Sequence, residues 1–201
     1  VGRVHDPTLL IVPGSPALVS ELSLADAPSR RLATAIRGAA AGDDRPVDIV
    51  CDLGEGSYTA RTGTFAAWGA PQTDVGGGNH LGELVVRYLL GERDYRPARD
   101  RIAPLDPKAL TVVVVDGPAG LTPRAPLAFI EEAPSVHEAL TELVATGAAP
   151  QPGLDADRLE QGGVVKPELW IELAELEPRT ATLLDVDATL GVGRYVGVWR
   201  W

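Results

Sequence analysis

The segment Leu110–Pro126, LTVVVVDGPAGLTPRAP, constrains the fold more than any other stretch of the chain. Val112–Val115 are four consecutive β-branched apolar residues, and a strand that is apolar at every position is typically buried on both faces. Such strands occur in parallel sheets that helices cover on both sides. Asp116-Gly117 ends the run, and a loop rich in glycine and proline follows. Ligands of open α/β sheets bind just beyond the carboxyl ends of such strands, so this segment predicts an architecture and a place for a site.

Further strands and helices are expected to alternate with this central strand. Apolar runs at residues 8–12 and 46–53 predict two strands, and the segments 180–186 and 194–199 predict two closing strands. Apolar residues at helical spacing predict helices that begin near Asp26, Asn79, Pro134, Leu154 and Pro167 and end near Gly42, Glu92, Thr146, Gln161 and Leu176. Residues 54–78 are expected to form a long loop, and residues 95–108 a solvated link. We therefore expect an α/β fold, a single three-layer domain over residues 1–201 with a central, mostly parallel sheet flanked by helices.

Composition narrows the classes of partner and compartment. Of the 201 residues 45% are apolar, enough for a core, and the formal net charge of −10 argues against nucleic acid and anionic membranes as partners. No apolar stretch is long enough to span a bilayer, and the start, VGRVHDP, lacks the apolar region of a signal peptide. The one cysteine, Cys51, is predicted to be an inert core residue. These features predict a cytoplasmic protein without a disulfide framework.

Six polar side chains are candidates for a site on the residues alone. Asp116 ends the central strand, where it is a candidate acid, base or metal ligand; the alternative is a turn residue that caps loop N–H groups. His80 is a second catalytic candidate, against which stands a surface histidine in the first turn of a helix. Glu55, Ser57, Tyr58 and Arg61 follow the second strand and are candidates for lining a crevice; the alternative is a mobile polar loop.

Five segments of the chain, taken in their order along the sequence, are similar to motifs of one known protein family. They are VPGSPALVSEL at 12–22, the stretch 48–63 that ends in Arg-Thr-Gly, WGAP at 68–71, the stretch 116–126 with DGPA, a threonine and Arg-Ala-Pro, and the stretch 184–195. In this order and spacing they resemble actinobacterial proteins related to the catalytic B subunit of class III extradiol ring-cleavage dioxygenases. Those relatives carry Cys-Pro-His-Pro-Pro at the first position and Tyr-Gly-Val-Pro at the third. The resemblance implies the three-layer fold of that subunit for the whole chain.

The resemblance also implies an iron site whose ligands are missing here. The active dioxygenases hold a non-haem iron with two histidines and a carboxylate. The first histidine falls at Gly14, and residues 51–56, where the second is expected, contain none. His80 stands in GNHLG, which is similar to the Asp-His-Gly stretch of the acid/base histidine in those enzymes. We therefore expect no bound iron, no other cofactor and no cleavage of catechols such as protocatechuate.

A shallow polar crevice is expected where the carboxyl ends of the first, second and central strands meet, more open than in the metal enzymes because of Gly14. Its predicted ligand-binding residues are Ser15, Glu55, Tyr58, Arg61, Asp116, Thr122 and Arg124, with Arg61 and Arg124 as counter-charges. Two other functions stay open. One is a metal-dependent oxygenase that uses His80, Asp116, Glu55 and Asp52; the other is an acidic interaction or scaffold protein. A small-molecule ligand and a homo-oligomer also stay open as partners.

Overall fold

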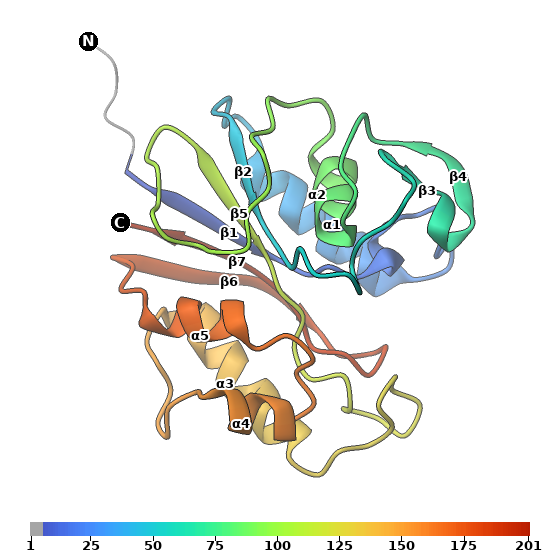
Figure 1. Ribbon diagram of the computed structural model, residues 1–201. Helices are drawn as coiled ribbons and strands as arrows, with labels where there is room; N and C mark the ends of the chain where they lie inside the picture. The colour runs from blue at the N-terminus through green and yellow to red at the C-terminus, as the bar shows by residue number, and fades with distance from the viewer. Residues whose placement is uncertain (1–5) are drawn as a thin grey trace.

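A five-stranded sheet forms the centre of the computed structural model, which describes residues 6–201 (Figure 1). Across the sheet the strands are β2 (Val47–Val50), β5 (Leu110–Val114), β1 (Thr8–Val12), β7 (Arg194–Arg200) and β6 (Thr180–Asp187). As predicted, β2, β5 and β1 are neighbours, and they pair in parallel. β7 is antiparallel to both β1 and β6, so the sheet is mixed and the expectation of a mostly parallel sheet needs correction. The sheet is mixed because the short turn at 188–193 joins β6 and β7 into a hairpin. A turn of this length can join only antiparallel strands.

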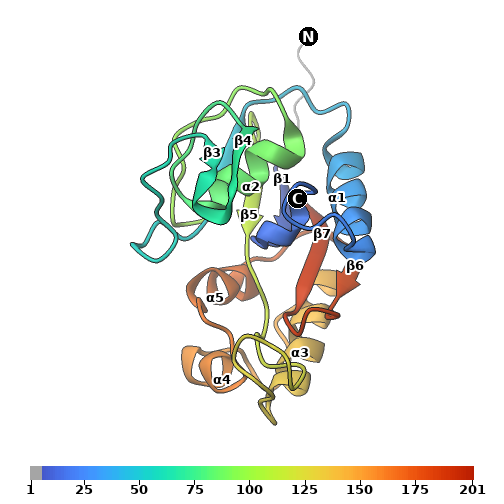
Figure 2. The same cartoon turned by 90° about the vertical axis from the view of Figure 1, so that its right-hand side faces the viewer.

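Helices cover both faces of the sheet and give the expected three layers (Figures 1 and 2). Leu10 and Val12 of β1 pack with α1 (Ala27–Ala40) and α2 (Leu81–Leu90). Leu9 and Ile11 pack on the opposite face, with α3 (Ala133–Thr146), α4 (Ala156–Gln161) and α5 (Glu168–Glu175). The two-residue period of a strand sends alternate side chains to opposite faces, which is why an unbroken apolar run marks a strand covered on both sides.

The start of α2 differs from the predicted one. The helix begins at Leu81, and its N-cap is His80, where Asn79 was expected. The Glu83 carboxylate accepts hydrogen bonds from the backbone N–H groups of Asn79 and His80, at 3.0 and 3.1 Å, which makes a capping box. The Asn79 side chain accepts the Thr62 hydroxyl over 2.6 Å and is therefore used elsewhere.

Both long connections carry more order than predicted. The first contains a small hairpin, β3 (Thr64–Phe65) and β4 (Ala70–Asp74), with a short 3₁₀ turn, Ala66–Trp68, between the strands. The second, expected to be a solvated link, runs along the edge of β2: Arg96 and Arg99 donate backbone N–H groups to Val47 and Ile49, each over 3.0 Å. The link therefore covers an edge whose backbone groups would otherwise be unpaired.

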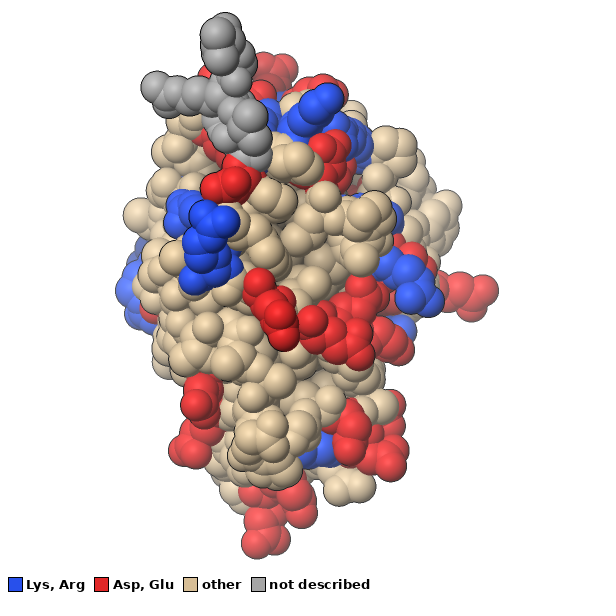
Figure 3. All heavy atoms as spheres, turned by 90° about the vertical axis from the view of Figure 1, so that its left-hand side faces the viewer, with Lys and Arg blue, Asp and Glu red and all other residues tan. Residues whose placement is uncertain are grey.

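Acidic side chains outnumber basic ones on the face at the amino ends of the parallel strands (Figure 3). This agrees with the formal net charge of −10. No helix within residues 6–201 is both long and apolar enough to cross a membrane. No signal peptide is expected in the segment VGRVHDP. Its first five residues lie outside the described residues.

Candidate functional site

A cleft of about 1170 Å³ opens beyond the carboxyl ends of β1, β2 and β5. Segments that follow these three strands form one side, together with the first turn of α2; α5 and the β6–β7 turn form the other. Most of the lining side chains are apolar or small, among them Pro16, Leu53, Leu81, Leu169, Ile171 and Val192. The crevice thus lies at the predicted edge, but it is large and mainly apolar where a shallow polar one was expected. The sequence pattern did not reveal that α5 would return to this edge and add a second wall.

One hydrogen bond joins the ends of β1 and β5 at the wall of the cleft. The Gly14 N–H donates to Oδ1 of Asp116 over 3.1 Å. A Cβ at position 14 would lie 3.0 Å from Oδ2 of Asp116 and 3.0 Å from Cγ1 of Val114. Glycine at position 14 therefore allows the Asp116 carboxylate to lie directly against the backbone of the β1 end. Ser15 lies beside them, and Ser15 and Asp116 share the cleft, as predicted.

The Asp116 side chain is exposed to the cleft, and the cleft walls displace part of the water around its carboxylate. This partial loss of water raises the pKa of the carboxyl to about 6 from the usual 3.8. The Gly14 N–H and the positive charge of Arg194 act in the opposite direction and reduce the shift. Within residues 6–201 no hydrogen-bond donor other than the Gly14 N–H reaches this carboxylate.

Buried aromatic side chains hold the Asp116 segment from behind. Nε1–H of Trp170, on α5, donates to the Asp116 carbonyl over 2.8 Å. The Tyr195 ring meets Trp170 edge-on with centroids 5.4 Å apart, and its hydroxyl lies 2.6 Å from Nδ1 of His137. Burial raises the pKa of Tyr195 and lowers the pKa of His137, so both are neutral near pH 7. A Cβ on Gly117 would lie 2.5 Å from the Tyr195 hydroxyl, so this close packing requires glycine after Asp116.

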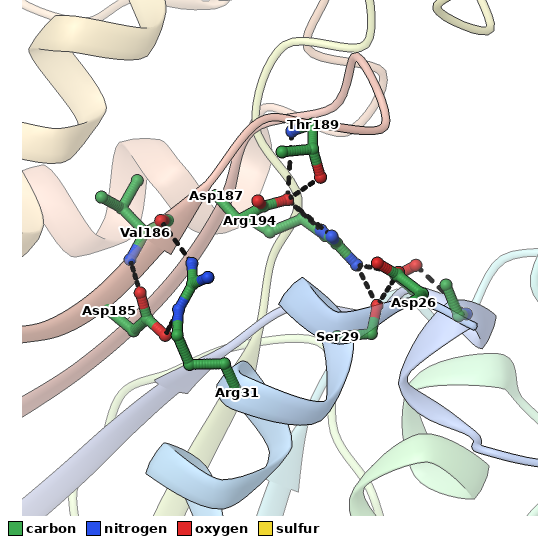
Figure 4. A network of polar contacts seen from close by, with 10 residues as sticks. Asp26, Ser29, Arg31, Asp185, Val186, Asp187, Thr189 and Arg194 are labelled. Carbon is green, nitrogen blue, oxygen red and sulfur yellow. Dashed lines mark hydrogen bonds and ion pairs between the residues drawn. The ribbon is translucent and has the colours of Figure 1, made fainter. Parts of the chain in front are cut away.

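A fully buried arginine, Arg194, lies next to the cleft and joins three parts of the fold (Figure 4). Its Nη2 is 2.5 Å from Oδ2 of Asp187, and its Nη1 donates to the Ser29 hydroxyl over 2.6 Å. Oδ2 of Asp26 lies 3.7 Å from the same Nη1. Burial by itself would raise the pKa of Asp187, but hydrogen bonds and charge from Arg194, with help from Thr189, hold it below its usual range. The network ties α1 to the β6–β7 hairpin.

The carboxylate at the end of β2, Asp52, already has a partner. Nζ of Lys166 lies 3.6 Å from its Oδ1, and the Gly54 N–H donates to the same oxygen over 3.0 Å. The two charged side chains are 55% and 32% exposed, so water screens this pair. Cys51 is buried against Gly82, and burial raises the pKa of its thiol to about 12, as expected of an inert core residue.

Several predicted site residues lie outside the lining of the cleft. Glu55 is exposed, and Tyr58 is 56% exposed and packs its ring against His80 with centroids 5.5 Å apart. His80 caps α2, and its Nδ1 lies 3.2 Å from Oε2 of Glu83. The structure thus brings Ser15 and Asp116 together but leaves His80, Glu55 and Tyr58 apart from them.

Arg61, Thr122 and Arg124 also lie outside the lining, so the prediction that Arg61 or Arg124 supplies a counter-charge in the crevice is wrong. The chain near Arg61 pairs with the segment before α2, where the Gly63 N–H donates to the Gly78 carbonyl over 2.8 Å. This pairing carries Arg61 away from the sheet edge. Arg124 is exposed on the outer loop after β5.

The basic side chains that do line the cleft are Arg101, Lys166 and Arg194. Sequence reasoning missed all three, because they come from a link, a helix start and a strand that are remote in sequence from the β1, β2 and β5 ends. The apolar spacing in α5 predicted Trp170 as a core residue, but nothing in the pattern indicated that its indole bonds the Asp116 carbonyl.

The donor set at this edge does not fit the iron site that the resemblance implies. Gly14 has no ligand atom, and the side chains on the wall at the strand ends include the carboxylates of Asp52 and Asp116 but no imidazole. Within the described residues no three His, Cys, Asp or Glu side chains are grouped so that they could hold a metal ion. The alternative set is not assembled either, because His80 and Glu55 lie outside the lining.

Comparison of the chain with protein-family models finds no match, and neither does comparison with curated protein sequences.

Proposed function

We propose that this chain binds a small molecule in the cleft at Asp116, on a scaffold similar to the B subunit of class III extradiol dioxygenases that does not carry the ring-cleavage iron site. The observation that supports this most is the pairing of Gly14 with Asp116 on the wall of a cleft of about 1170 Å³. The position where the resemblance expects an imidazole holds a glycine, and a carboxylate fills the space beside it.

The shape and chemistry of the cleft suit a small organic molecule. Ligand pockets are concave, mainly apolar and provided with a few polar groups that fix orientation. Here apolar side chains such as Leu53, Leu169 and Ile171 offer contact area, while Asp116 and Ser15 offer polar atoms. The buried supports behind Asp116, among them the indole of Trp170, hold these polar atoms on rigid elements.

Two measurements on the untagged protein test the proposal. The first is elemental analysis after growth with added iron and anaerobic purification, together with an assay for ring opening of protocatechuate. We expect substoichiometric iron and no ring opening. One iron per chain together with turnover of a catechol would overturn the proposal.

The second measurement is a thermal-shift screen with a library of small aromatic and aliphatic compounds. A ligand that binds only the folded state stabilises it by RT ln(1 + [L]/Kd) and therefore raises the melting temperature as its concentration rises above Kd. The matched variant is Ser57→Trp, which places a large side chain on a residue of the lining in the loop after β2. Compounds that stabilise the wild type should lose this effect in Ser57→Trp, and equal stabilisation of both proteins would count against the cleft as the site.

A further inference from the structure

We propose that the cleft selects an organic cation, an apolar body that carries a protonated amine, with the amine against the Asp116 carboxylate. The inference rests on the proposed function and adds the chemical class of the ligand. It comes from three features of the cleft: a carboxylate without a counter-ion, an excess of carboxylates over basic side chains in the lining, and walls that are mainly apolar.

The first feature is the state of Asp116. Its Oδ1 accepts the Gly14 N–H, and within residues 6–201 no donor reaches its Oδ2. The positive charge that lowers the pKa of Asp116 is that of Arg194, but the Arg194 guanidinium is bonded to Asp187 and Ser29. A carboxylate that lines a cleft without a cation beside it gains a charge-assisted hydrogen bond when a ligand supplies the cation.

The second feature is the balance of the other charges. Five carboxylates line the cleft, those of Asp52, Asp100, Asp116, Glu168 and Glu172, against the three basic side chains of Arg101, Lys166 and Arg194. Lys166 is paired with Asp52, and Arg194 is paired within its buried network. Arg101 is the one lining cation without an ion pair among the described residues, and it is exposed. The local field therefore favours a positive ligand, as does the net charge of −10.

The third feature is the character of the walls around Asp116. Val114, Leu169 and Val192 line the same cleft as Asp116 and provide apolar surface in it. An ammonium ion without an apolar body would leave this surface in contact with water. A charged head on an aromatic or aliphatic body uses both parts, because the body is removed from water while the head replaces its hydration with a charge-assisted hydrogen bond.

A series of three probes of the same size tests the charge that the cleft selects. They are 2-phenylethylammonium, the neutral 2-phenylethanol and the anionic phenylacetate, titrated at pH 7.5 into wild-type protein, Asp116→Asn and Glu55→Gln. Glu55→Gln removes a carboxylate from the loop after β2, outside the lining, and it is the matched control for net charge. Binding is followed in the ¹H–¹⁵N spectrum through the indole N–H of Trp170, which bonds the Asp116 carbonyl.

We expect the ammonium probe to bind about tenfold or more tightly than the alcohol, the usual range for a hydrogen bond to a charged group. This preference should vanish in Asp116→Asn and persist in Glu55→Gln. Equal binding of all three probes at Trp170 would overturn the cation inference and leave the proposed function standing. Tighter binding of phenylacetate, lost in Arg101→Gln, would reverse the sign of the inference. If none of the probes moves the Trp170 signal, the inference falls, and a compound from the thermal-shift screen then decides whether the proposed function falls with it.

Discussion

The buried arginine beside the cleft leads to a quantitative prediction about Asp187. Replacing Asp187 by asparagine keeps the volume of the side chain but removes the charge that faces the fully buried Arg194 at 2.5 Å. Loss of one partner of a buried ion pair typically costs about 3–5 kcal/mol, because the remaining charge stays buried. The Asp26 carboxylate, 3.7 Å from the guanidinium, can compensate in part, so we expect the lower end, about 3 kcal/mol.

The control is Asp185, which lies two residues earlier on the same strand. Asp185 pairs with Arg31, whose side chain is 54% exposed, over 2.7 Å, as Figure 4 shows. The Asp185 side chain is 16% exposed, but water reaches the pair through the exposed Arg31 side chain. A pair screened in this way contributes about 0–1 kcal/mol, so Asp185→Asn should stay within that range. The assay is urea unfolding followed by tryptophan fluorescence. For a chain of this size, about 3 kcal/mol also corresponds to a drop in melting temperature of roughly 6–12 °C.

The cost of Asp187→Asn should also depend on pH in a definite direction. The pKa of Asp187 is lowered in the folded protein, so its contribution to stability is present above the usual value of 3.8 and is lost as the pH falls through the lower, folded value. The difference between wild type and Asp187→Asn should therefore be full at pH 7 and shrink below about pH 4. A cost of under about 1 kcal/mol at pH 7, equal to that of Asp185→Asn, would refute the reasoning about the buried network.

Three further predictions concern the packing and the titration of the site. Gly82→Ala should lower the free energy of unfolding by about 1–3 kcal/mol in urea, because the new Cβ would lie 2.6 Å from Cβ of Cys51. Gly38→Ala is the control in α1: no atom lies within 4 Å of its new Cβ, so the free energy of unfolding should rise by roughly 0.5–1 kcal/mol. The raised pKa of Asp116 means that its contribution to stability is present below 3.8 and is lost as the pH rises through about 6. Asp116→Asn should therefore gain stability relative to wild type between pH 4 and pH 7 in the same assay, and a constant difference would contradict the assignment. The Cys51 thiol should react with Ellman's reagent at pH 8 only after denaturation, because it is buried and its pKa is near 12. Rapid labelling of the native protein would show that the packing of Cys51 against Gly82 opens.

The parallel half of the fold could be predicted from sequence, because its signal is local. Apolar runs such as Val112–Val115 are long enough to identify strands buried on both faces, and the helices between them carry clear periodicity. The position of the site followed from one topological rule, that parallel strands end at the same edge, and this rule brought Ser15 and Asp116 together.

The remaining parts depend on contacts between residues that are far apart in sequence. Arg61 and Arg124 were expected in the crevice because they follow strand ends, but the pairing of residues 58–63 with 78–80 and the outer course of the loop after β5 lead them away. Lys166 reaches the cleft and Trp170 supports Asp116 from behind because α5 and the residues before it return to this edge of the sheet, and no local pattern encodes that return. The direction of β7 likewise depends on the hairpin turn before it and not on its own composition.

The central claim is that the cleft at Asp116 is a binding site, and the two buried indoles provide the most direct measurement. Nε1–H of Trp170 bonds the Asp116 carbonyl over 2.8 Å, while Nε1–H of Trp199 bonds the Val144 carbonyl over 2.9 Å on another part of the sheet. In a ¹H–¹⁵N titration with a compound that raises the melting temperature, the Trp170 indole signal should shift in a saturable manner and the Trp199 signal should stay in place. A shift of Trp199 without Trp170, or stabilisation that moves neither signal, would contradict the account.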